Sequence, residues 1–213
     1  MRYPLFIKPS NRGDGKGIDE KSVVSTEHEM REKIDAIHTE LRSDALVEEY
    51  LPGREFSVAV MINPATMQLH AMPVEIITEL DARGHSYLGE LVKTANTEQV
   101  IAVEDKSIKT ALCDLAIGAF VALGAQDYGR VDIRFDTNDK PNFIEANLMP
   151  GLSDHGYLVR CYKLNNQGTY DDMILSIAQL GIKRSEATLN TGINIGTDSS
   201  PATDISSASI ALG

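Results

Sequence analysis

The sequence has no tryptophan, only two cysteines and few basic residues among its 213 positions. Its 20 Lys and Arg are outnumbered by 31 Asp and Glu, and the net charge of −11 argues against a general nucleic-acid surface and against binding to anionic membranes. Cys113 and Cys161 show no metal-ligand spacing, which favours a reducing, cytoplasmic setting. There is neither a membrane-length apolar run nor the apolar core of a signal peptide. We therefore expect a soluble, cytoplasmic protein that binds neither nucleic acid nor membrane.

What the chain does contain is 42% hydrophobic residues, enough for one substantial core. The expected strands are residues 4–8, 45–50, 55–62, 67–77, 130–135 and 142–147, and the expected helices are 26–42, 105–123 and 169–181. Residues 10–18 read as a glycine-rich loop and 79–99 as a long functional loop. A Ser- and Thr-rich tail from residue 184 is not expected to pack. The buried strand so close to the N-terminus is typical of a fragment of a longer chain.

The strands flanking a predicted turn at 137–140 make the clearest hairpin. A four-residue loop places Asp132 directly across from Glu145, and Arg130 directly across from Asn147. Facing carboxylates destabilise a sheet unless they share a proton or a cation lies between them. Glu145 and Asn147 share a face by alternation, and these carboxylate and amide oxygens suit Mg²⁺. A merely solvated strand face would explain the same alternation, so both interpretations stand for these residues alone.

The glycine-rich loop is ambiguous by itself. Gly13, Gly15 and Gly17 match neither the Walker nor the Rossmann spacing. Alternate glycines nevertheless allow backbone N–H groups to approach phosphate, and Lys8 could add a positive charge. A surface lysine beside a mobile loop is the alternative.

Residues 47–56 are ambiguous in the same way. Exposed backbone beside Tyr50 and Leu51 could bind the edge of an adenine, and Glu48 or Glu55 could accept hydrogen bonds from the adenine amino group or the ribose. A solvated acidic pair next to a turn is the plainer interpretation.

Taken in order, four blocks resemble the ATP-grasp family, and within it the D-alanine:D-alanine ligases. They are LFIKPS at 5–10, VEEYLPGREF at 47–56, GRVDI at 129–133, and FIEAN at 143–147 followed by MPGLS at 149–153. The resemblance covers residues 4–183 and implies an α+β fold in which two subdomains with antiparallel sheets clasp ATP, without the N-terminal domain of the ligases. It implies a partial small subdomain with the glycine-rich loop and adenine hinge (1–57), a large subdomain with the metal site (58–183) and a disordered tail (184–213).

The resemblance also implies individual roles. For ATP, it implies that Lys8 contacts the phosphates and that the adenine site is lined by Glu48, Tyr50 and Leu51. Glu55 would hold the ribose, and Lys93 would be the lysine that covers the nucleotide. Asp132, Glu145 and Asn147 would hold two Mg²⁺ ions, or Mn²⁺ in their place. Arg130 would stabilise an acyl phosphate and the tetrahedral state formed when an amine attacks it, giving an amide and ADP. Amino-acid or peptide carboxylates and amines would be the substrates, and the full-length form could be a homodimer.

Three positions depart from the D-alanine ligase pattern. Asp14 replaces a serine in the glycine-rich loop, Thr94 replaces a tyrosine after the loop lysine, and Gly156 replaces the serine that holds the substrate carboxylate. All three are substrate-side positions, so the resemblance does not carry D-alanine over as the substrate. The alternative from another class is a catalytically silent ATP-binding module. Arg130 beside a full set of metal ligands favours the ligase, although this fragment alone could be inactive.

Overall fold

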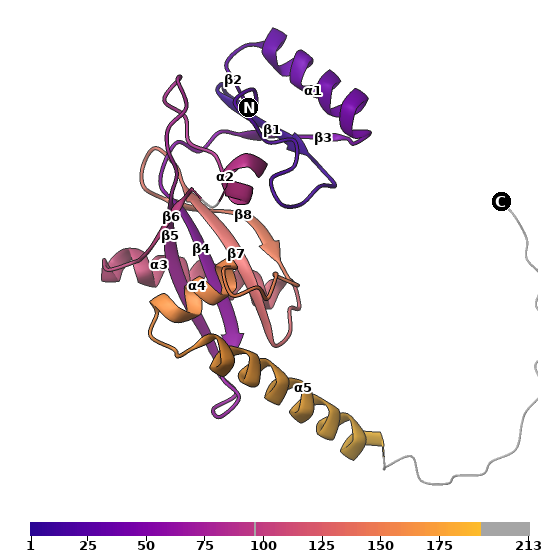
Figure 1. Ribbon diagram of the computed structural model, residues 1–213, viewed down its shortest axis with the longest axis vertical. Coiled ribbons are helices and arrows are strands. Elements are labelled where there is room, and N and C mark those ends of the chain that lie inside the picture. Colours follow the sequence, from indigo (N-terminus) through magenta and orange to yellow (C-terminus); the bar gives the residue numbers. More distant parts are fainter. Residues whose placement is uncertain (96, 193–213) are drawn as a thin grey trace, which may run out of the picture.

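The computed structural model describes residues 1–95 and 97–192, without the side chains of residues 91, 93, 94 and 188–192. Within this part the chain forms two antiparallel sheets with helices packed on them (Figure 1). The strands are β1 (Leu5–Pro9), β2 (Val23–Val24), β3 (Ala45–Glu49), β4 (Glu55–Ile62), β5 (Leu69–Ile77), β6 (Gln99–Ala102), β7 (Tyr128–Phe135) and β8 (Pro141–Asn147). The helices are α1 (Glu27–Leu41), α2 (Glu90–Ala95), α3 (Lys106–Ala122), α4 (Tyr157–Leu164) and α5 (Tyr170–Gly192). The predicted α+β class is confirmed, and no helix in the described ranges is long and apolar enough to cross a bilayer.

The smaller sheet has the strand order β2-β1-β3 and carries α1. Thr26 caps the helix: its hydroxyl accepts a hydrogen bond from the Glu29 N–H, and the Glu29 carboxylate accepts one from the Thr26 N–H. The predicted capping box is therefore confirmed. Ile37 of the helix packs with Ile7 of β1, which fixes α1 against the sheet.

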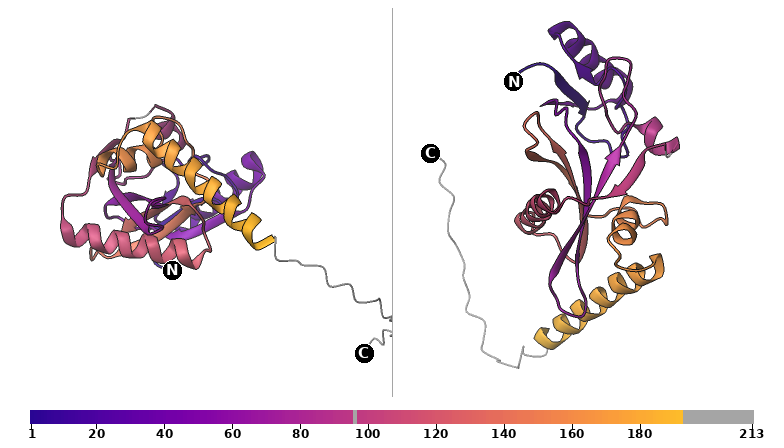
Figure 2. Two further views of the ribbon diagram at one scale, coloured as in Figure 1. Left: turned by 90° about the horizontal axis from the view of Figure 1, so that it is seen from below. Right: turned by 90° about the vertical axis from the view of Figure 1, so that its left-hand side faces the viewer.

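The larger sheet has the order β6-β5-β4-β7-β8, and helices cover both of its faces (Figure 2). On one face α3 packs over a core that includes Val58, Val131 and Ile133. On the other face α4 and the start of α5 pack over Ala59, with Leu158 of α4 fully buried. Successive residues of a strand lie on opposite faces, so the polar residues of β7 that alternate with Val131 and Ile133 face α4.

Four short elements are absent from the sequence-based prediction: β2, β6, α2 and α4. The predicted long functional loop at 79–99 contains regular structure near its end, where α2 and the first residue of β6 lie. α4 is only eight residues long and starts after Gly156, which has no side chain to cap it. Neither a cap nor a long apolar period therefore marks it in the sequence.

The last helix also differs from the prediction. It continues to Gly192, so the expected end at Gly181 is wrong, and residues 184–192 are helical rather than a disordered tail. Lys183 donates to the Pro64 carbonyl and Arg184 pairs with Asp127, which holds this part of α5 near the end of β4. The rest of the predicted tail, 193–213, lies outside the described residues.

The predicted hairpin is present with a turn one residue longer than expected, because residues 136–140 rather than 137–140 join β7 to β8. A β-bulge in β8 compensates for the difference. Ile133 faces Phe143 while Asp132 faces Glu145, which leaves Ile144 as the extra residue.

The bulge decides which side chains share a face. Beyond it Asp132 faces Glu145 and Arg130 faces Asn147, so both predicted pairs are confirmed. A register shifted by one residue would turn Glu145 and Asn147 to the opposite face of the sheet. The bulge therefore restores the alignment on which the predicted site depends.

Candidate functional site

A row of polar side chains runs along the α4 face of the larger sheet. Across β4 and β7 the facing pairs are Glu55 with Arg134, Ser57 with Asp132, and Ala59 with Arg130. The row continues onto β8 with Glu145 and Asn147. The structure thus gathers on one face the predicted catalytic arginine and all three predicted metal ligands.

Arg130 is fixed by Asp132 two residues along the same strand. Its Nε lies 3.0 Å from Oδ1 and its Nη2 lies 2.9 Å from Oδ2 of that carboxylate. The side chains of Arg130 and Asp132 are only 10% and 15% exposed. Burial opposes the charged guanidinium, but the Asp132 charge and hydrogen bonds, with a smaller contribution from Glu145, raise the pKa of Arg130 overall. Arg130 therefore carries a permanent positive charge in a preset orientation.

Ser57 is a further member of the row that the sequence does not single out. Its residue is fully buried on β4, and its hydroxyl donates to Asp132 Oδ1 at 2.7 Å. The sequence does offer one indication of its role: Ser57 is a serine inside a run of apolar residues. In the structure it faces Asp132 across β4 and β7. Ser57 completes the anchoring of the Asp132 carboxylate.

Asp132, Glu145 and Asn147 fit a divalent cation by the chemistry of their donors. Two carboxylates and an amide oxygen on a common face are the hard ligands that Mg²⁺ prefers, with phosphate and water filling the remaining positions. Oδ1 of Asp132 already accepts hydrogen bonds from Ser57 and Arg130, whereas Oδ2 accepts one from Arg130 and keeps a lone pair for a metal. No cluster of three or more His, Cys, Asp or Glu forms a cation site in the described ranges, and the proposed set relies instead on two carboxylates and Asn147.

α4 covers Arg130 with an aromatic ring. The guanidinium carbon of Arg130 lies 5.3 Å from the ring centroid of Tyr157. The Tyr157 hydroxyl and Arg160 both donate to one oxygen of Glu98, each at 2.9 Å. Burial and the neighbouring Glu98 carboxylate raise the pKa of Tyr157 well above its ordinary value, so its hydroxyl remains a donor. Sequence reasoning misses Tyr157 and Arg160 because it does not predict α4, and it misses Glu98 because that residue lies in the predicted loop at 79–99, which shows no firm periodicity.

The smaller sheet brings together two predicted ATP ligands. Lys8 on β1 and Glu48 on β3 form an ion pair at 2.8 Å, with side chains 13% and 34% exposed. The Glu48 side of the pair is the part open to solvent, so a ligand can approach the pair from there.

The remaining predicted ATP ligands lie where the two sheets meet. Tyr50 is buried, and the centroid of its ring lies 5.3 Å from that of His85 in an edge-on contact. Leu51 is half-buried next to it, and the Glu55 carboxylate pairs with Arg134 at 3.0 Å. The backbone of Lys93 lies in α2, while its side chain lies outside the described residues.

The glycine-rich loop meets the segment before α2 backbone to backbone. Gly15 has φ +74°, and a Cβ there would lie 2.8 Å from the backbone of Gly89. A Cβ on Gly89 would lie 2.6 Å from the Ile18 carbonyl oxygen. The buried Lys33 ammonium donates to the Gly17 carbonyl at 2.9 Å and so attaches the loop to α1. Two segments far apart in sequence therefore close over each other.

Gly89→Ala is expected to destabilise the fold by about 1–3 kcal/mol, because the new methyl overlaps backbone that cannot rotate away. Gly118→Ala is the matched control. Gly118 lies on the exposed side of α3 with nothing within 4 Å of a Cβ, so this substitution should raise the free energy of unfolding by about 0.5–1 kcal/mol. Denaturant unfolding of both variants measures the difference. Equal stabilities would mean that the loop contact is not made in solution.

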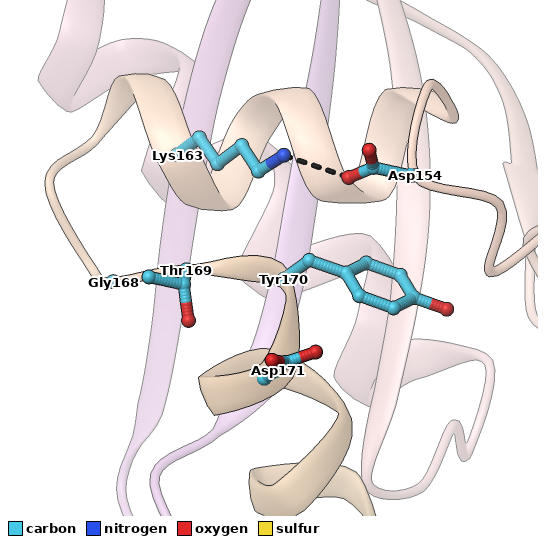
Figure 3. Close-up of a pocket in the computed structure, with 6 residues that line it drawn as sticks. All are labelled: Asp154, Lys163, Gly168, Thr169, Tyr170 and Asp171. Atoms are coloured by element: carbon cyan, nitrogen blue, oxygen red, sulfur yellow. Dashed lines mark hydrogen bonds and ion pairs between the residues drawn. The ribbon is translucent and has the colours of Figure 1, made fainter.

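A hollow of about 520 Å³ lies between α4 and the start of α5, away from the polar row (Figure 3). Asp154 and Lys163 form an ion pair of 2.7 Å in its wall. It contains none of the predicted site residues, so the candidate site remains on the sheet face.

Comparison with known proteins places the chain in a family. A sequence model described as "D-ala D-ala ligase C-terminus" matches residues 1–179. The chain belongs to this family. The D-alanine--D-alanine ligase of Bordetella petrii is 30% identical over 179 residues, which cover 83% of this chain and 52% of the relative. That of Hydrogenovibrio crunogenus is 30% identical over 155 residues, covering 73% and 46%. This member of the D-ala D-ala ligase C-terminus family spans about half the length of the curated relatives that it matches.

Solved structures support the same fold. The D-alanine--D-alanine ligase of Bacillus anthracis complexed with ATP aligns with a TM-score of 0.66 at 17% identity, over 87% of this chain and 55% of that one. The VanG D-Ala:D-Ser ligase of Enterococcus faecalis aligns with a TM-score of 0.65 at 24% identity, over 84% and 50%. The predicted ATP-grasp fold with antiparallel sheets is confirmed for this family member.

Proposed function

We propose that this chain binds Mg²⁺-ATP and supplies the nucleotide and metal site of a carboxylate–amine ligase that works through an acyl phosphate. The observation that carries the proposal is the rigid hairpin face on which Arg130, fixed by Asp132, lies beside Glu145 and Asn147. Family membership and the ATP complex of the Bacillus anthracis relative support it.

The proposed ATP ligands come from both sheets. They are Lys8, Glu48, Tyr50, Leu51, Glu55 and Lys93. We keep a division into subdomains at 1–57 and 58–183 as part of the proposal, with β4 (Glu55–Ile62) crossing the boundary. Asp132, Glu145 and Asn147 would hold Mg²⁺, which supplies neutralisation of the phosphate charge when bound.

Arg130 is the residue that we assign to the chemistry. Negative charge develops on the acyl oxygen when the amine attacks, and a guanidinium already oriented by Asp132 stabilises that charge without reorganising. The side chains of Arg130 and Asp132 are largely shielded from solvent, which strengthens their electrostatic contribution. The substrates on this proposal are an amino-acid or peptide carboxylate and an amine, with Asp14, Thr94 and Gly156 setting a specificity that need not be for D-alanine.

ADP release tests the proposal. The protein is incubated with ATP, Mg²⁺ and single amino acids, and hydroxylamine is added to trap any acyl phosphate as a hydroxamate. We expect ADP release that requires Mg²⁺ and one particular class of amino acid, and hydroxamate in equal amount. ATP binding without turnover would favour the catalytically silent module, and no ATP binding at all would refute both functions.

A further inference from the structure

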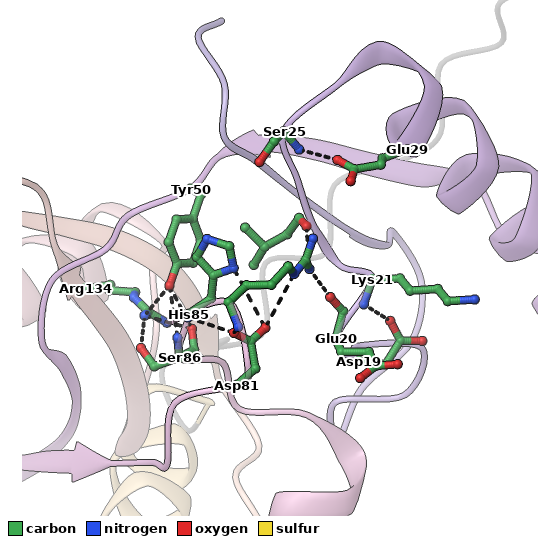
Figure 4. A network of polar contacts seen from close by, with 12 residues as sticks. Asp19, Glu20, Lys21, Ser25, Glu29, Tyr50, Asp81, His85, Ser86 and Arg134 are labelled. Carbon is green, nitrogen blue, oxygen red and sulfur yellow. Dashed lines mark hydrogen bonds and ion pairs between the residues drawn. The ribbon is translucent and has the colours of Figure 1, made fainter.

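Arg134 is a buried cation that the proposed chemistry does not use. It lies at the end of β7 with its side chain 9% exposed, and its guanidinium contacts three separate segments. Figure 4 shows two of these contacts, with Tyr50 and Ser86. Nη1 pairs with Glu55 of β4 at 3.0 Å. Nη2 donates to the Ser86 carbonyl at 2.9 Å, to the Ser86 hydroxyl, and to the Tyr50 hydroxyl at 3.4 Å. One side chain thus connects a proposed ribose ligand, the hinge between the sheets and the segment 78–89.

The segment 78–89 is held to the smaller sheet by other residues. Arg83 donates to the Val23 carbonyl at 2.9 Å and to the Glu20 carbonyl. The Ser86 N–H donates to the Tyr50 hydroxyl at 3.1 Å, so backbone and side chain of one residue join the same network. The segment leaves the larger sheet at the end of β5, and Arg134 of β7 holds its later part, at Ser86, to the same sheet.

The charge of Arg134 makes its contacts interdependent. A buried guanidinium needs a nearby anion and satisfied donors, and Glu55 supplies the anion. Nε has no acceptor among the described residues, so Arg134 relies on its remaining bonds to Ser86 and Tyr50. If a ligand hydroxyl forms a hydrogen bond with the Glu55 carboxylate, the orientation of the Arg134 guanidinium changes, and so do its hydrogen bonds to Ser86. Charge-assisted bonds of this kind are about twice as strong as neutral ones.

We propose that Arg134 is a positioning residue that couples Glu55 to the segment 78–89, so that nucleotide binding and immobilisation of the segment reinforce each other. The inference rests on the proposed function, because Glu55 must be a nucleotide ligand. Coupling between two binding events is reciprocal: the factor by which ATP protects the segment equals the factor by which the fixed segment tightens ATP binding.

The test is Arg134→Met, with Arg54→Met as the matched control. Arg54 also forms a two-bond pair with a glutamate of the same sheet, Glu75, and among the described residues it makes no hydrogen bond with the segment 78–89. Hydrogen exchange of the segment and Mg²⁺-ATP affinity are measured for the wild type and both variants. We expect Arg134→Met to speed exchange in 78–89 by about tenfold or more, to lower ATP affinity by about tenfold, and to abolish the protection that ATP adds there. Arg54→Met should resemble the wild type in all three.

The outcomes separate this inference from the proposed function. A wild type that does not bind ATP refutes the function. A wild type that binds ATP, with Arg134→Met indistinguishable from Arg54→Met in the segment, overturns the coupling and leaves the function intact. If Arg134→Met fails to fold, Ser86→Ala removes the contact of the Ser86 hydroxyl with Arg134 while keeping the Arg134–Glu55 pair and the proposed ATP ligand Tyr50. That variant should lose part of the ATP-induced protection, and full protection in it would equally overturn the proposal.

Discussion

Arg130→Met should lower amino-acid-dependent ADP release by about 10²–10³-fold, because a preorganised donor at developing negative charge contributes at that scale. Arg130 is held by two hydrogen bonds to Asp132, so the substitution removes a positive charge from a fixed position, and solvent does not replace its stabilising effect. Steady-state kinetics should place the loss in kcat, since the interaction strengthens only as the tetrahedral state forms.

The same substitution should destabilise the fold. The Asp132 side chain is only 15% exposed, and its carboxylate would lose the cation that neutralises it. Removing one partner of a buried pair costs about 3–5 kcal/mol, so the assay must run well below the melting temperature of the variant. Arg130→Lys keeps the charge but cannot bond both Asp132 oxygens, and it should recover stability more than activity. A folded Arg130→Met protein with wild-type kcat would remove Arg130 from the mechanism.

The second large effect is expected at Asp132. Asp132→Asn keeps the shape of the side chain but removes the charge that Arg130 and the proposed Mg²⁺ share. We expect Mg²⁺-ATP affinity to fall by about 10–100-fold. Stability should also fall, because the guanidinium of Arg130 stays buried without a counter-charge. Calorimetric titration of ATP at several Mg²⁺ concentrations measures the first effect, and denaturant unfolding measures the second.

Glu145→Gln separates the contribution of a metal ligand to Mg²⁺-ATP affinity from the contribution of the Arg130–Asp132 pair to stability. Glu145 lies directly across from Asp132 but is exposed, so its charge can be removed with little effect on stability. If both residues bind Mg²⁺, both variants should need more Mg²⁺ for the same ATP affinity, and only Asp132→Asn should unfold more easily. An Asp132→Asn protein whose Mg²⁺ dependence is unchanged would show that Asp132 only positions Arg130.

The long periodic elements and the hairpin pairs can be predicted from the sequence. The Thr26–Glu29 capping box marks the start of α1, and simple alternation places Arg130, Asp132 and Arg134 on one side of β7. These features depend on residues close together in the chain, where helix and strand periods are direct geometric consequences of the backbone.

What the sequence does not predict depends on contacts between distant segments. β2 has two residues and exists because Val23 and Val24 pair with β1. α4 lacks a side-chain cap and forms over a core that includes Ala59 of β4. The Glu98–Tyr157 bond and the four contacts of Arg134 likewise join residues 48 or more positions apart in the chain. No local sequence pattern predicts such contacts.

Ile144 is a residue that no residue of β7 faces, so the length of the turn and the alignment of the site can vary separately. Deleting Ile144 alone would leave a regular ladder in which Ile133 still faces Phe143 and Asp132 still faces Glu145. One residue inserted between Glu145 and Asn147 would instead turn Asn147 to the opposite face of the sheet while the two carboxylates stayed opposite each other.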